Sequence, residues 1–164
     1  GLEVTLVTDL GEAQAILLMG LPDESNPDAF DALLEDARTR ALPVLCTNPE
    51  RASPRAGGAV VTSPGTLAHA YAESGGSVQF YGKPHAPIYR SLEVALDLPP
   101  ERLLMIGDSL EHDIAGAAQA GWRAVFIRGG LHSAAFTGAD VQAEVAALAA
   151  KDAAPMPDFT LWEL

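Results

Sequence analysis

The sequence predicts an α/β fold with a mostly parallel sheet, and three observations support this prediction. Short apolar runs alternate with segments of helical periodicity along the chain. Several runs are continuously apolar, which is typical of strands buried on both faces. Residues that favour helix starts and stops separate them. With 164 residues, the chain is long enough for one domain, or for two small ones, to bury a core.

Seven segments are predicted as strands because they are short, apolar and bounded by turn or capping residues. In chain order these strands are Val4–Val7, Ala15–Met19, Pro43–Cys46, Ala59–Val61, Val78–Phe80, Leu103–Ile106 and Ala124–Ile127.

Helices are predicted between these strands from apolar spacing and from end signals. The first follows Asn26 and Pro27, the second runs from Ser63-Pro64 to Gly75, the third follows Pro84, the fourth covers about 111–120 before Gly121, and the last covers about 140–150.

The segment Gly107–Ile114 carries the strongest chemical signal. Asp108 and Asp113 follow the apolar strand Leu103–Ile106 directly, at the sheet edge where open α/β folds bind ligands. Mg²⁺ commonly takes one or two protein carboxylates and fills its other positions with water and phosphate oxygens. A Gly-Asp pair after a strand is also an ordinary turn, so this segment alone leaves both interpretations open.

Lys83 is the second candidate, because it lies between a strand and a helix in Tyr81-Gly82-Lys83-Pro84. A lone lysine is usually a solvated surface residue. Together with a downstream Gly-Asp, Lys83 could instead neutralise a phosphoryl group that shares the cation. A strand-helix-strand crossover between Lys83 and Asp108 would bring both to one edge of one sheet.

These residues belong to a series of short motifs in a fixed order: Thr47-Asn48-Pro49-Glu50, Gly82-Lys83-Pro84, Gly107-Asp108-Ser109 with Asp113, and Gly116-Ala117 with Ala120-Gly121. The series resembles the haloacid dehalogenase (HAD) superfamily of phosphohydrolases. The first motif resembles the class IIA branch, the NagD-like and nitrophenylphosphatase-like enzymes, with Glu50 in place of the usual Asp. The group of predicted sugar phosphatases shows the closest resemblance, which covers about residues 14 to 164.

The resemblance implies a Rossmann-like HAD core, of which residues 79–164 would be the C-terminal half, and an α/β cap domain, incomplete, at residues 1–78. It implies Mg²⁺-dependent hydrolysis of small phosphorylated metabolites such as sugar phosphates. Asp108 would bind Mg²⁺ and Asp113 would hold it directly or through water. Lys83 would be catalytic and would also contact substrate, and Thr47, Asn48 and Glu50 would shape the leaving-group pocket.

The nucleophile of the family is missing from the matched region. Members of the family attack phosphorus with an Asp in an Asp-x-Asp motif after their first strand. The nearest candidate is Asp9, but Gly11 takes the place of the second Asp, and we interpret Asp9 as a loop or capping residue. The chain is therefore expected to be the C-terminal portion of a longer enzyme and to be inactive alone.

Composition excludes several other classes. The formal net charge is -12, and the absence of a basic cluster argues against a nucleic-acid partner. No apolar stretch is long enough for a membrane span. Cys46 is the only cysteine; it is expected to be a small buried residue and suits a reducing, cytoplasmic compartment. An uncovered sheet edge where further core strands belong would favour self-association, so a homo-oligomer is an expectation.

Two alternative classes stay open at this stage. A non-catalytic phosphate-binding or regulatory domain could keep Lys83 and Asp108 and lack the nucleophile. A receiver-type signalling domain also uses acidic residues and a lysine, but its lysine follows the phosphoacceptor, whereas Lys83 precedes Asp108. Ser109 has no adjacent histidine in sequence and is expected to cap the following helix. His85 could contact substrate or simply begin a helix, and His112 is expected to have no chemical role.

Overall fold

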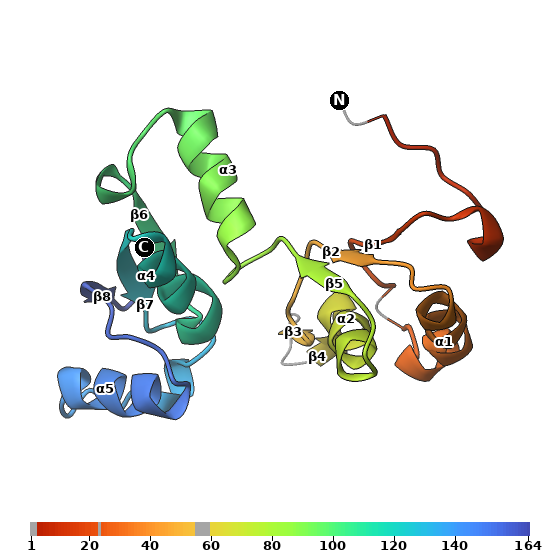
Figure 1. Cartoon of the computed structure of the whole chain (residues 1–164). Coiled ribbons are helices and arrows are strands. Elements are labelled where there is room, and N and C mark those ends of the chain that lie inside the picture. Colours follow the sequence, from red (N-terminus) through yellow and green to blue (C-terminus); the bar gives the residue numbers. More distant parts are fainter. Residues whose placement is uncertain (1–2, 23, 55–59) are drawn as a thin grey trace. The chain divides into compact units, whose positions relative to one another are not determined.

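The chain was analysed as a computed structural model, and the structure describes residues 3–22, 24–54 and 60–164. The chain forms two compact units, Gly1–Gly82 and Lys83–Leu164 (Figure 1). Each unit has a three-stranded parallel sheet with helices. The α/β class with parallel sheets that the sequence predicted is confirmed.

The first unit is built on the sheet β1-β2-β5, formed by β1 (Ile16–Leu18), β2 (Val44–Cys46) and β5 (Val78–Phe80). All pairs are parallel, and Leu45 of β2 is opposite Leu17 and Gln79. Two helices connect these strands, α1 (Asp31–Thr39) and α2 (Pro64–Glu73). A separate antiparallel pair, β3 (Ala52–Pro54) with β4 (Val60–Thr62), follows β2.

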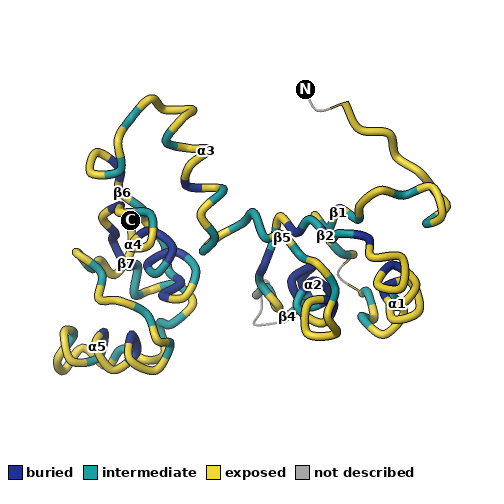
Figure 2. The backbone as a smooth tube through the Cα atoms, in the orientation of Figure 1, coloured by how far each residue is buried: buried dark blue, intermediate teal, exposed yellow. Residues whose placement is uncertain are grey.

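The core of the first unit lies between this sheet and its helices. Val44 and Cys46 of β2 are fully buried and pack with side chains of α1 and α2. Figure 2 colours the backbone by burial and shows buried positions in these elements in dark blue. Tyr71 of α2 is 1% exposed, and its hydroxyl donates to the Leu42 carbonyl at 2.7 Å. A buried tyrosine hydroxyl needs such a partner, so this bond fixes α2 against the chain that enters β2.

The second unit is built on the sheet β6-β7-β8, which is also parallel: β6 (Leu104–Gly107), β7 (Arg123–Ile127) and β8 (Phe159–Leu161). Its helices are α3 (Ala86–Leu96), α4 (Ala115–Ala120) and α5 (Val141–Lys151). A π-helical turn, Leu110–Ile114, precedes α4. No helix in the described part of the chain is long and apolar enough to cross a membrane.

The core of the second unit gathers Tyr89 of α3, Phe126 of β7 and Val145 of α5, each 1% exposed or less. By contrast, large apolar side chains of the edge strands β6 and β8 are 45% to 48% exposed: Leu104, Ile106, Phe159 and Leu161. The expectation of self-association depends on such surface and stays a prediction.

Most predicted elements are found, with four differences. Val4–Val7 forms no strand, although its residues are described. The strands β3 and β8 were not predicted as strands. A four-residue 3-10 helix, Pro27–Phe30, precedes α1. The helix expected from residue 111 begins as the π-helical turn. Of the predicted strand 59–61, residue 59 lies outside the described residues.

Candidate functional site

Asp108 lies at the carboxyl end of β6, where two loops meet. Its Oδ2 accepts a hydrogen bond from the Leu131 amide at 2.9 Å. Gly130 packs against this carboxylate so closely that an added Cβ would lie 2.2 Å from Oδ2. The loop after β7 therefore holds one oxygen of Asp108, while Oδ1 has no hydrogen-bond partner among the described residues.

Asp113 occupies the π-helical turn and is 3% exposed. Its Oδ1 accepts from the Lys83 ammonium at 2.5 Å, and its Oδ2 accepts from the Ser109 amide at 3.1 Å. The amides of Asp113 and Ile114 both donate to the Ser109 carbonyl, at 2.9 and 3.1 Å, which winds the turn wider than an α-helix. Both carboxylate oxygens of this buried charge are satisfied, as burial requires.

Lys83 reaches this loop from the segment before α3, and its side chain is 43% exposed. The structure brings it together with Asp113, 30 positions later. The reason that the sequence suggested was wrong: β5 pairs with β2 and β6 with β7, so the strands before and after α3 belong to separate sheets. Contact arises instead because the start of α3 lies against the π-helical turn.

The charges of Asp108, Asp113 and Lys83 explain what the site could hold. Two carboxylates and one ammonium leave a net charge of about minus one, which would repel a phosphate dianion. A divalent cation on the open side of Asp108 would reverse the sign of this balance. Oxygen donors are those that Mg²⁺ prefers. Among the described residues no three His, Cys, Asp or Glu side chains gather into a group that could hold a metal ion.

Tyr89 of α3 lies directly behind the π-helical turn, and its hydroxyl donates to the His112 carbonyl at 3.2 Å. Burial, and secondly the negative charge of Asp113, raise the pKa of Tyr89 to about 12. The phenol is therefore neutral at physiological pH and keeps the proton that it donates.

Sequence reasoning missed the contact between Ser109 and His112. The Ser109 hydroxyl accepts from the His112 amide at 3.2 Å, which confirms the predicted cap, and it also lies 3.0 Å from His112 Nδ1. The signal was available, because residues three apart at a helix start face each other. His85 lies immediately before α3, and both of its interpretations stay predictions.

The first unit contains the other three predicted site residues, in the loop after β2. Main-chain packing fixes this loop: an added Cβ on Gly65 would lie 2.1 Å from the Pro49 carbonyl oxygen, and one on Gly82 would lie 2.5 Å from that of Thr47. Thr47 is exposed, and Asn48 and Glu50 are partly exposed. Side chains on a fixed loop can meet a ligand with little loss of entropy, but their roles stay predictions.

Two residues have the structural roles that the sequence suggested. Asp9 accepts from the Gly11 amide at 2.8 Å and caps a short 3-10 helix. Cys46 is fully buried, and burial raises the pKa of its thiol.

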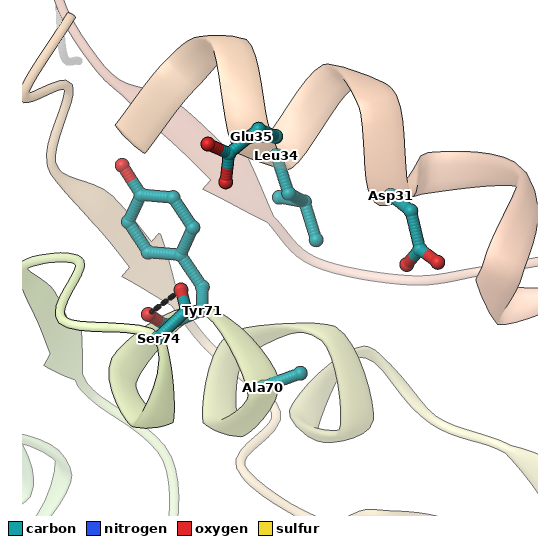
Figure 3. A pocket seen from close by; sticks show the side chains of 6 residues that line it. All are labelled: Asp31, Leu34, Glu35, Ala70, Tyr71 and Ser74. Atoms are coloured by element: carbon teal, nitrogen blue, oxygen red, sulfur yellow. Dashed lines mark hydrogen bonds between the residues drawn. The ribbon is translucent and has the colours of Figure 1, made fainter. Parts of the chain in front are cut away.

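A pocket of about 280 Å³ opens between α1 and α2 of the first unit and contains no predicted site residue (Figure 3). Asp31, Leu34, Glu35, Ala70, Tyr71 and Ser74 line it. Most of its polar groups are already engaged: Glu35 pairs with Arg38, and the Ser74 hydroxyl donates to the Tyr71 carbonyl at 2.8 Å. We therefore assign no ligand to it.

Known proteins resemble this chain over both units. A family profile described as HAD-hydrolase-like matches residues 80–154. The dihydroxyacetone phosphatase of Corynebacterium glutamicum (strain R) is 29% identical over 108 residues, which cover 66% of this chain and 38% of that protein.

Solved structures extend the similarity. A haloacid dehalogenase-like family hydrolase from Brucella suis 1330 is 37% identical, with a TM-score of 0.67, over 82% of this chain and 54% of that one. The p-nitrophenyl phosphatase from Archaeoglobus fulgidus shares the fold, with 23% identity and a TM-score of 0.71, over 95% of this chain and 56% of that one. The chain thus spans about half the length of these solved relatives.

Proposed function

Because this chain belongs to the haloacid dehalogenase-like hydrolases, we propose that it is a member of their class IIA branch and provides the cation-binding and charge-neutralising part of a phosphomonoesterase site. Substrates would be small phosphorylated metabolites such as sugar phosphates. The relatives include a dihydroxyacetone phosphatase and a p-nitrophenyl phosphatase, which supports the reaction class more strongly than any one leaving group.

The observation that carries the proposal is the contact between Lys83 and Asp113. An ammonium has three donors, and Asp113 takes one of them in a fixed direction. The partly exposed Lys83 keeps its other donors for phosphoryl oxygens, whose charge must be neutralised during transfer. Asp113 therefore orients Lys83, and because both of its oxygens are engaged, it would meet a cation through water.

Asp108 is the better direct ligand, because the Leu131 amide fixes one oxygen and the other is open. Mg²⁺ bound there would supply positive charge against the phosphoryl oxygens. Asp108 itself would hold the cation at the end of β6, and the Leu131 amide would prevent the carboxylate from turning away.

The attacking group would come from outside these 164 residues, since they contain no Asp-x-Asp sequence. In the family an aspartate attacks phosphorus and forms an aspartyl-phosphate, which water then hydrolyses. We assign the first unit as the cap, incomplete, with Thr47, Asn48 and Glu50 around the leaving group, and the second unit as the C-terminal half of the catalytic core.

The test is phosphate release with Mg²⁺ from a panel of sugar phosphates and p-nitrophenyl phosphate. Two proteins are compared: this chain alone, and this chain joined to an N-terminal segment of a family member that carries the Asp-x-Asp motif. We expect turnover only from the joined protein, and its loss when the first Asp of that motif is changed to Asn.

Two results would contradict the proposal. Turnover by this chain alone that disappears in Asp108→Ala would show that the nucleophile lies within it. Phosphate binding by a folded joined protein without turnover of any substrate would favour the non-catalytic phosphate-binding alternative.

A further inference from the structure

The start of α3, which carries Lys83, is held against α4 by an unusually close backbone approach at Gly116. An added Cβ on Gly116 would lie 2.0 Å from the Tyr89 hydroxyl oxygen, 2.7 Å from the ring carbon that bears it, and 3.0 Å from the Pro84 Cα. Real Cβ atoms do not approach other atoms this closely, so only glycine fits without a shift of its neighbours.

Two polar bonds extend this contact on either side. The Tyr89 hydroxyl donates to the His112 carbonyl in the π-helical turn, next to Asp113. One to two turns further along α3, Glu93 accepts from the Trp122 indole at 2.8 Å, and the Trp122 ring meets Tyr89 edge to face at 5.2 Å. Helix α3 is thus tied to the chain before and after α4.

Lys83 and Asp113 lie at the ends of this contact. Lys83 is covalently next to Pro84, and Asp113 precedes Gly116 by one helical turn. A methyl group at 116 would push the Pro84 backbone and the Tyr89 ring away, and Lys83 would move with them. A shift of about 1 Å is enough to impair a positioned catalytic group.

We propose that Gly116 and Tyr89 are positioning residues, which set the separation of the Lys83 ammonium and the Asp113 carboxylate through the close packing of α3 on α4. The geometric claim stands on the second unit alone. Only its consequence for turnover rests on the proposed function.

The experiment measures the hydrogen exchange of lysine ammonium protons with water by ¹⁵N NMR, without metal or phosphate. The chain has two lysines, Lys83 and the exposed Lys151, so Lys151 is an internal reference. In the parent chain, Lys83 should exchange more slowly than Lys151, because its protons are held by Asp113. In Gly116→Ala, Lys83 exchange should rise about two- to fivefold, the factor that corresponds to an ion pair of this exposure, and Lys151 should not change.

Two variants separate positioning from general loosening. Ala118→Gly weakens the same helix at an exposed position away from Tyr89 and should leave Lys83 exchange at the parent value. The double variant Gly116→Ala/Tyr89→Phe lacks the hydroxyl that lies closest to the new methyl group, and it should recover part of the parental protection.

A folded Gly116→Ala chain with parental Lys83 exchange would overturn the proposal, and so would an equal acceleration in Ala118→Gly. If Gly116→Ala does not fold, Tyr89→Phe decides alone: a smaller but measurable acceleration at Lys83 supports positioning, and no change refutes it. In the joined phosphatase, Gly116→Ala should lower kcat more than it raises KM. If the Lys83 ammonium protons lose their protection from exchange but kcat is unchanged, the positioning proposal would still hold, and Lys83 would instead be removed from the proposed chemistry.

Discussion

The two units hold their predicted site loops, at the ends of parallel strands, by different means. Each has three parallel strands, and in each a loop after one strand carries predicted site residues. In the first unit, main-chain carbonyls of Thr47 and Pro49 packed against glycines fix the loop. In the second unit, the carboxylates of Asp108 and Asp113 accept from main-chain amides. The comparison teaches that main-chain packing can hold a loop whose carboxylate, Glu50, stays partly exposed, whereas a loop with a buried carboxylate such as Asp113 must also satisfy that charge with hydrogen bonds.

The largest effect is expected when the Asp108 carboxylate of the second unit is removed, because one of its oxygens has no hydrogen-bond partner among the described residues. Asp108→Ala in the joined phosphatase should lower turnover at least about a hundredfold, comparable to the loss of one group that stabilises developing charge. Steady-state kinetics across a Mg²⁺ series measures the effect. Glu111→Ala, which removes an exposed carboxylate in the π-helical turn that follows Asp108, is the matched control. Equal losses in both variants would show that the charge of the loop, not Asp108 in particular, matters.

The next largest effect is expected from a substitution that disturbs the main-chain packing of the loop after β2 in the first unit. Gly65→Ala forces a methyl group against the Pro49 and Glu50 carbonyls and should destabilise this unit by about 1 to 3 kcal/mol. Gly20→Ala, with no atom within 4 Å of the added Cβ, should change stability by no more than about 0.5 kcal/mol.

The units carry separate reporters for this measurement. Cys46 is buried in the first unit, and the two tryptophans, Trp122 and Trp162, belong to the second. Urea unfolding followed by Cys46 alkylation should shift in Gly65→Ala, while tryptophan fluorescence should not. A shift of both probes by the same amount would mean that the units unfold as one.

Tyr89→Phe tests the second unit through pH. Loss of the hydrogen bond to His112 should cost about 1 kcal/mol at neutral pH. The pKa of Tyr89 in the folded chain, about 12, lies above the ordinary value of 10.0, so its contribution is complete below pH 10 and declines as pH rises towards 12. Urea titrations by tryptophan fluorescence between pH 8 and 12 should decline less steeply in Tyr89→Phe. Identical profiles would exclude Tyr89 as the source of the decline.

The smallest effect concerns Asp158, which accepts from the Ala124 amide at 2.8 Å and pairs with Arg123. The amide hydrogen bond first, and Arg123 after it, hold the pKa of this carboxyl below its ordinary value. Its contribution is therefore present above about pH 4 and is lost as pH falls through the lowered pKa. Asp158→Asn should cost less than about 1 kcal/mol at pH 7 and flatten the acid limb of the stability profile. A steeper acid limb would contradict this sign.

The sequence predicted those elements whose signals are local. The continuous apolar runs of β2 and β7 and the cap at Asn26 identify their elements, because burial on both faces and an amide-accepting side chain leave direct traces. Val4–Val7 shows the limit: it has strand-like residues, but a strand forms only where a partner edge is available. The opposite holds for β8, whose half-exposed Phe159 and Leu161 give a weak signal that pairing with β7 overrides.

For the site, the sequence identified the residue types but not the partners. It predicted Lys83 and Asp108 at one edge of one sheet, but the strands that precede them belong to separate sheets. The contact of Lys83 with Asp113 depends on the packing of α3 on α4. Tyr89 could not be recognised as part of the site, since its importance depends on that packing. The Ser109–His112 contact is local, and its three-residue spacing is visible in the sequence.

Because Asp113 lies in a π-helical turn, the site depends on the number of residues in this segment as well as on their chemistry. Successive residues of a helix are rotated by about 100° around its axis, and the extra residue of a π turn changes the angular phase of every later residue in the helix. Deleting one exposed residue, Glu111, would remove no group that the proposed chemistry uses. It would nevertheless rotate Asp113 away from Lys83, or turn Gly116 away from Tyr89. In this segment a change of length should therefore be less tolerable than almost any exposed substitution. Related chains that keep the chemistry should keep the second carboxylate five positions after the first, as Asp113 follows Asp108.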